Sequence, residues 1–144
     1  MEGRPYIAGV AAIRPLWHPD LAMKVSLETV RRYAGVYRQQ AAAAEHDRRA
    51  CAARVLARLP ALAQMLRRDF GAHRVGYFGS LRSGVLHGTS DVDLYVDRLP
   101  RGQYFDAVSR LWTALERPVD LVELERASPS LRAAIEEEGI DLDG

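Results

Sequence analysis

The 144-residue sequence predicts an α/β (α+β) domain in which a small mixed β-sheet is backed by helices. Segments with apolar residues at helical spacing alternate with three short apolar segments of strand length, at residues 75–78, 91–97 and 118–124. With 48% hydrophobic residues, the chain can also bury the core that one such domain needs.

Residues 1–22 are expected to form an N-terminal arm. Pro5, Pro15 and Pro19 interrupt this segment, and no periodicity is sustained in it. One hypothesis is that Met23 is the natural start of the chain; otherwise the arm packs on its own helices or docks on a partner.

Residues 23–49 are expected to form an N-terminal helix that opens near Ser26. Its apolar positions at helical spacing are Leu27, Val30, Tyr33, Ala34 and Tyr37. This face can cover the sheet, dock a partner protein or pair two copies into a homo-oligomer. The apolar stripe continues to Leu66, with Pro60 marking a kink or a fresh helical start, and Gly71 ends it.

Residues 50–144 are expected to form the main domain. After the first strand come a short helix at 80–84, the second strand, a helix at 102–115 and the third strand. A final helix has clear boundary signals, with Ser128 as its cap, Pro129 in the first position and Gly139 as its terminator.

The segment that follows the first strand indicates phosphate chemistry. The strand ends in Gly79-Ser80, where a glycine lets backbone amides approach a phosphate and the serine adds a hydroxyl donor. Asp91 and Asp93 then alternate with apolar residues, so both carboxylates should lie on one face of the second strand. Two carboxylates this close repel unless a cation lies between them, and hard oxygen ligands favour magnesium or manganese.

A third carboxylate is expected from the neighbouring strand, because two-metal transfer places its cations about 3.5–4 Å apart and two aspartates are usually too few. Asp120 is the candidate, and Glu123, its competitor, falls on the opposite face by alternation. An acidic pair alone is also typical of a solvated strand face. Its combination with the Gly-Ser turn, Ser90 and a third acidic strand favours a metal site.

These motifs, over about residues 50–143, resemble the DNA polymerase beta-like nucleotidyltransferases, and most closely the minimal nucleotidyltransferases of prokaryotes. The resemblance implies a nucleotidyltransferase fold, two Mg²⁺ ions (with Mn²⁺ possible) and ATP as substrate. It implies catalytic, metal-binding roles for Asp91, Asp93 and Asp120, and nucleotide binding by Gly79, Ser80, Arg82 and Ser90. Many relatives read Gly-Ser-Arg-Ala-Arg-Gly at residues 79–84. Here one arginine is displaced and another absent, so Arg82 either reaches a phosphate or is simply exposed.

Composition excludes several functional classes. A net charge of +1 argues against nucleic-acid binding, which usually needs a basic excess. The single cysteine, Cys51, excludes an internal disulfide and suits a reducing cytosol. No apolar run approaches the roughly 18 residues that span a bilayer. A cytoplasmic protein without membrane partners is therefore expected.

The acceptor of the nucleotide is implied by the resemblance alone. Minimal nucleotidyltransferases are often found beside a HEPN-domain ribonuclease toxin, which implies an antitoxin that transfers AMP from ATP to a tyrosine hydroxyl of that toxin. Two alternatives stay open at this point. The chain can neutralise the toxin by binding alone, or it can modify a small molecule such as an antibiotic.

Overall fold

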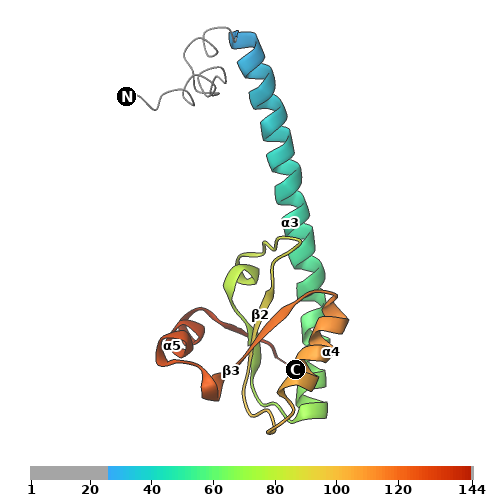
Figure 1. The fold of residues 1–144 in the computed structure, drawn as a ribbon, viewed down its shortest axis with the longest axis vertical. Helices are drawn as coiled ribbons and strands as arrows, with labels where there is room; N and C mark the ends of the chain where they lie inside the picture. The colour runs from blue at the N-terminus through green and yellow to red at the C-terminus, as the bar shows by residue number, and fades with distance from the viewer. Residues whose placement is uncertain (1–25, 144) are drawn as a thin grey trace, which may run out of the picture. The chain divides into compact units, whose positions relative to one another are not determined.

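A computed structural model describes residues 26–143 of the protein. The chain divides into two compact units, residues 1–42 and residues 43–144, and the predicted arm at 1–22 lies outside the described residues. In the first unit, the described residues form the N-terminal part of helix α3 (Leu27–Phe70), shown in blue and cyan in Figure 1.

Helix α3 begins and ends where the sequence predicts. The Ser26 hydroxyl accepts a hydrogen bond from the Thr29 amide at 3.1 Å, which caps the first turn. At the other end Gly71 adopts a left-handed φ of 73°, and the Ala72 amide bonds back to the Leu66 carbonyl at 3.1 Å. The helix continues through Pro60, so this proline does not start a new helix.

The second unit contains a small mixed sheet, as predicted, but the sheet has four strands and not the three that the sequence indicated. Its strands are β1 (Val75–Tyr77), β2 (Val92–Val96), β3 (Val119–Glu123) and β4 (Ile140–Asp141). They are ordered β3-β2-β1-β4, with β1 antiparallel to both β2 and β4 and with β2 parallel to β3. Helix α4 (Tyr104–Leu115) makes the crossover that two neighbouring parallel strands require.

The remaining elements are short. A 3₁₀ helix, η1 (Gly79–Ser83), follows β1, and a second one, η2 (Leu124–Arg126), follows β3. Helix α5 (Pro129–Glu138) has the predicted boundaries, and the Ser128 hydroxyl accepts a hydrogen bond from the Leu131 amide at 3.2 Å. The sequence did not predict β4 or η2.

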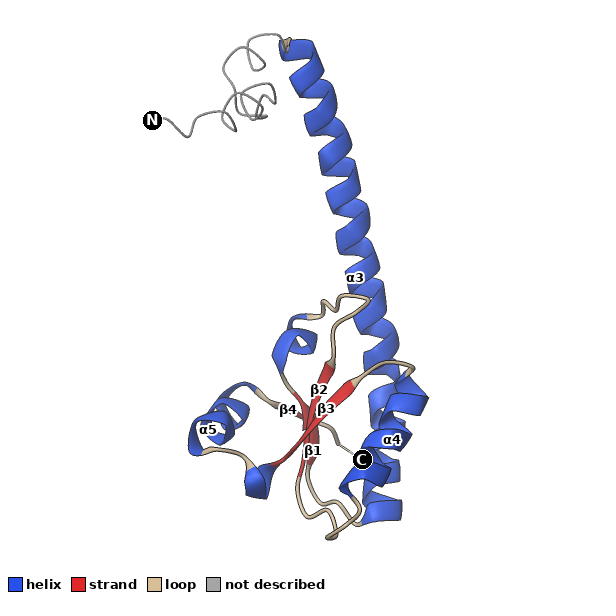
Figure 2. Ribbon diagram, viewed as in Figure 1, coloured by secondary structure: helices blue, strands red, loops and turns tan. Residues whose placement is uncertain are grey.

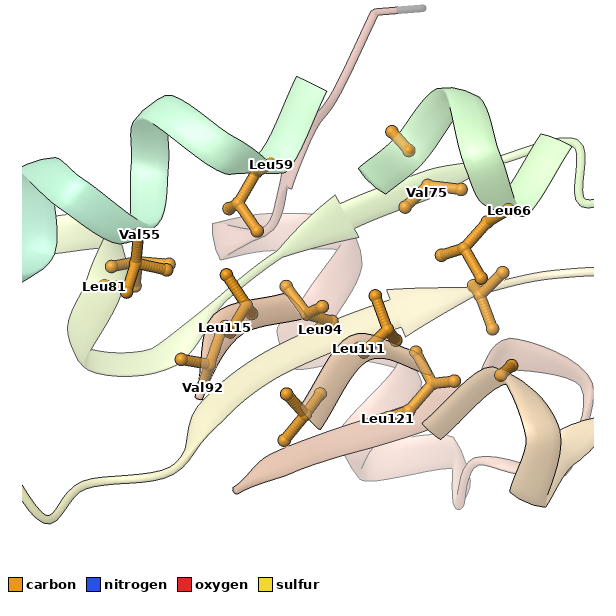
Figure 3. Packing of buried hydrophobic residues seen from close by; sticks show 14 of the residues in the cluster. Val55, Leu59, Leu66, Val75, Leu81, Val92, Leu94, Leu111, Leu115 and Leu121 are labelled. Atoms are coloured by element: carbon orange, nitrogen blue, oxygen red, sulfur yellow. The ribbon is translucent and has the colours of Figure 1, made fainter. Parts of the chain in front are cut away.

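Helices cover both faces of the sheet but not equally (Figure 2). Helix α4 and the C-terminal part of α3 pack on one face, where they form the main core with the alternate side chains of β2 and β3. Figure 3 shows Leu59, Leu66, Leu94, Leu111 and Leu121 meeting in this core. On the other face, buried Tyr95 of β2 packs with Leu124 and with Ile135 of α5. This second face therefore also carries Asp93 and Asp120, which alternate with the core residues.

No helix within residues 26–143 is long and apolar enough to cross a membrane.

Candidate active site

The candidate site lies where β1 ends beside β2, at the turn that begins with Gly79. The Phe78 amide donates to the Asp93 carbonyl at 3.1 Å, so the turn follows directly from the ladder between the strands. Gly79 has a left-handed φ of 74°, and a β-carbon built on it would lie 2.4 Å from Asp93 Oδ2. Only glycine therefore fits here, because its backbone lies against the Asp93 carboxylate.

The sheet register aligns two of the predicted carboxylates. Asp93 and Asp120 are direct partners in the parallel pair β2–β3, and neighbouring strands lie about 4.8 Å apart. Asp91 lies just before β2 and is exposed, as is Asp120, whereas Asp93 is half-buried. Alternation and register thus place Asp93 and Asp120 side by side on the face opposite the main core.

The pKa of the Asp93 carboxyl reflects its burial and its two acidic neighbours. Burial, followed by the negative charges of Asp120 and Asp91, raises the pKa of the Asp93 carboxyl above its ordinary value. Within residues 26–143, none of the three carboxylates forms an ion pair, and no three potential ligands converge into a ready-made metal site. The donor set is nevertheless one that fits a hard divalent cation, which would relieve the mutual repulsion.

The other predicted site residues lie around this turn. Ser80 and Arg82 are exposed on η1, and Ser83 Oγ donates to the Ser80 carbonyl at 2.7 Å. Ser90 is half-buried one residue before Asp91. Glu123 pairs with Arg126 at 3.5 Å, and alternation puts it on the face opposite Asp120. Glu123 is therefore not part of the group formed by the three aspartates.

Arg117 is a residue of the site region that the sequence did not reveal. Its Nη1 atom donates to the carbonyls of His87 and Ser90, at 3.1 and 3.2 Å, and its Nη2 atom lies 2.8 Å from Cys51 Sγ. The Val92 amide also donates to the Pro118 carbonyl at 3.0 Å. One guanidinium thus ties α3 and the loop that leads into Asp91 to the start of the strand that carries Asp120. The sequence carried no signal for this role, because both carbonyls lie far from Arg117 along the chain.

Comparison with known proteins assigns this geometry to a family. A family model described as "Polymerase beta, Nucleotidyltransferase" matches residues 61–142, which is more than half of the chain. The chain belongs to this nucleotidyltransferase family. No curated protein matches its sequence significantly.

Solved structures of nucleotidyltransferases share the fold. A structure described as a minimal nucleotidyltransferase is 29% identical, with a TM-score of 0.55, and the match covers 62% of this chain and 93% of that one. A toxin–antitoxin structure with AMP-PNP is 30% identical, with a TM-score of 0.52, over 59% of this chain and 73% of that one. A mutant toxin–antitoxin MntA–HpeT structure is 26% identical, with a TM-score of 0.51, over 58% and 70%.

The nucleotidyltransferase match begins at residue 61, so it leaves residues 27–60 of α3 outside it. It includes all of the elements that build the site, from β1 and its Gly79 turn to β3. The chain is therefore an enzyme of the nucleotidyltransferase type.

Proposed function

We propose that this nucleotidyltransferase is a metal-dependent antitoxin that transfers AMP from ATP to a tyrosine hydroxyl of a HEPN-domain ribonuclease toxin. One observation carries the enzymatic part, namely the backbone of Gly79 lying against the Asp93 carboxylate, with Asp120 in register beside it. The partner and the nucleotide are supported by structural relatives whose descriptions name a toxin–antitoxin pair and the ATP analogue AMP-PNP.

In this proposal, the three aspartates hold the divalent metal, with magnesium as the first choice, manganese as the alternative and two ions in all. When bound, the metal would neutralise charge on the triphosphate and lower the pKa of the attacking hydroxyl. Asp91, Asp93 and Asp120 suit this role because the first and the third both lie within electrostatic range of Asp93. A bound cation would remove the repulsion between these carboxylates.

The Gly79 turn holds the phosphates in the same scheme. A glycine lets the backbone approach an anion closely, and the exposed Ser80 hydroxyl can donate to a phosphate oxygen. Arg82, exposed on η1, supplies a positive charge for the leaving pyrophosphate, and Ser90 supplies a hydroxyl beside Asp91. These four residues orient the triphosphate next to the carboxylates.

The transfer itself is a displacement at the α-phosphorus. The tyrosine oxygen of the acceptor forms a bond to this phosphorus, and the bond to the bridging oxygen of pyrophosphate breaks. The proton of the hydroxyl passes to a carboxylate, for which exposed Asp120 is the candidate, and then to water. The products are an AMP-modified tyrosine and pyrophosphate.

Intact-mass analysis tests the proposal. The product of the neighbouring gene would be incubated with the enzyme, ATP and magnesium, and a mass gain in AMP-sized steps is expected. The variant Asp91→Asn/Asp93→Asn should show no gain, whereas Asp47→Asn, which removes an exposed acid on α3, should behave as wild type. A stable complex without any mass gain would instead identify an antitoxin that acts by binding alone.

A further inference from the structure

The first half of α3 presents an apolar stripe that no described residue covers. We call it the N-terminal stripe, and its members are Leu27, Val30, Ala34, Tyr37, Ala41 and Ala44. They recur at alternating spacings of three and four residues, which is the pattern of a coiled-coil seam. Leu27, Val30 and Tyr37 are 75%, 50% and 73% exposed.

The helical segment that carries this stripe has no core of its own. Of the described residues 26–42, none is buried, and the main cores lie entirely within residues 43–143. A single helix of this length is marginal in water, since most helix stability in proteins comes from packing an apolar face. The N-terminal stripe therefore needs an occupant.

The order of side-chain sizes along the stripe identifies that occupant. The large residues Leu27 and Val30 stand at one end, whereas Ala41 and Ala44 stand at the other. In an antiparallel pair of identical helices, residue 27 faces residue 44 of the other copy, 30 faces 41 and 34 faces 37. Every layer then combines one large side chain with one alanine, which is the alternation that fills a helix interface evenly.

A parallel pair would pack much less well. It would place Tyr37 against Tyr37 in one layer and alanine against alanine in three others, at residues 34, 41 and 44. Crowded and empty layers both destabilise an interface. We propose that two copies of this protein associate through the N-terminal stripe as an antiparallel helix pair, independently of the transfer reaction.

Charged residues beside the N-terminal stripe allow the antiparallel orientation of the two helices to be tested. Arg31 and Arg38 flank it on one side, and antiparallel pairing brings Arg31 of one copy near Arg38 of the other. These exposed like charges oppose association and are screened by salt. The dimer should therefore become tighter as the NaCl concentration rises from about 0.05 M to about 0.5 M.

The chain offers a matched pair of variants for the test. Val30 lies in the stripe and Val36 lies away from it on the same helix, and they are similarly exposed, at 50% and 45%. In sedimentation equilibrium, wild type should dimerise. Val30→Glu should raise the dissociation constant by roughly tenfold or more, because it places a carboxylate in an apolar layer. Val36→Glu, with the same change in helix propensity, should leave the dimer unchanged.

Disulfide trapping tests the orientation. An affinity-tagged Leu27→Cys chain is mixed with an untagged Ala44→Cys chain under mild oxidation, and wild type is the control because its Cys51 is only 7% exposed. Crosslinks between the two different chains should form first, and crosslinks within the Leu27→Cys population should be rare. A monomeric wild type, equal effects of the two valine variants, or dominant crosslinks between two Leu27→Cys chains would each overturn the proposal.

Discussion

The contact between Gly79 and Asp93 makes a quantitative prediction about Gly79→Ala. Alanine at a left-handed φ of 74° costs about 1–2 kcal/mol. In addition, its β-carbon would lie 2.4 Å from Asp93 Oδ2, so the carboxylate must rotate away. We expect the coupling between the two residues to add about 0.5–3 kcal/mol, which brings the total loss of stability to about 1.5–5 kcal/mol.

Gly84 provides the matched control for this prediction. Its φ is 78°, almost the same as that of Gly79, but nothing lies within 4 Å of a β-carbon built on it. Gly84→Ala should therefore cost only the backbone term, about 1–2 kcal/mol. The difference between the two variants measures the contact with Asp93.

Urea denaturation and a transfer assay together test the reasoning. Gly79→Ala should be less stable than Gly84→Ala and should lose nucleotidyl transfer under conditions where it is still folded, because the carboxylate has moved. In an Asp93→Ala background, the two glycine variants should cost the same. Equal losses of stability in the wild-type background, together with retained transfer by Gly79→Ala, would refute the proposed site geometry.

Three further predictions concern Asp93, Arg117 and Tyr95. Asp93→Asn should abolish transfer yet raise the free energy of unfolding at pH 7, because the raised pKa of this carboxyl means that its ionised form is penalised in the folded state. This gain in stability should shrink as the pH falls towards about 4, where the carboxyl becomes protonated. Urea titrations at several pH values measure it. Arg117→Gln should cost about 1–3 kcal/mol, since the Ser90 carbonyl loses its charged donor, and it should lower the rate of transfer, measured beside urea denaturation. Tyr95→Phe should cost about 1–2 kcal/mol at pH 7. In this variant the Asp141 carboxyl loses the hydrogen bond from the Tyr95 hydroxyl. Burial raises the pKa of Asp141, but this hydrogen bond and Arg74 outweigh burial and hold the pKa below its usual value. The stability that the hydrogen bond contributes is therefore present above about pH 4 and lost below it, so wild type and variant should differ less in denaturation at pH 3.

Much of the fold could be predicted because its elements carry strong local signals. Alternation identified β2 and β3, and the capping serine and proline at 128 and 129 fixed the start of α5. Strand β4 could not be predicted, because it has only two residues and is held by contacts distant in sequence, such as the Leu142 amide donating to the Val75 carbonyl at 2.8 Å. Pairing with β1 decides its structure, whereas its own composition does not.

In the candidate site, too, the local sequence predicted some features, whereas others depend on contacts distant in sequence. Alternation within each strand predicted the face that Asp93 and Asp120 share, and the parallel register then made them neighbours. Asp91 was predicted inside the second strand, but in the structure β2 begins at Val92, so Asp91 belongs to the preceding loop. The hydrogen bonds from Arg117 to this loop join residues distant along the chain, so no pattern in the local sequence predicts them.

The hydrogen-bond and ion-pair partners of the half-buried acidic side chains support the proposed cation-binding role of the site. Among the described residues, four carboxylates are half-buried: Glu45, Asp93, Asp97 and Glu123. Arginine side chains pair with Glu45 and Glu123, and two backbone amides donate to Asp97. Asp93 has no such donor within residues 26–143, and its electrostatic neighbours are two further aspartates. A half-buried carboxylate without a donor destabilises a fold unless it has another use. In a chain this rich in arginine, Asp93 is thus the one half-buried carboxylate among the described residues without a donor, and this agrees with the proposed cation-binding role.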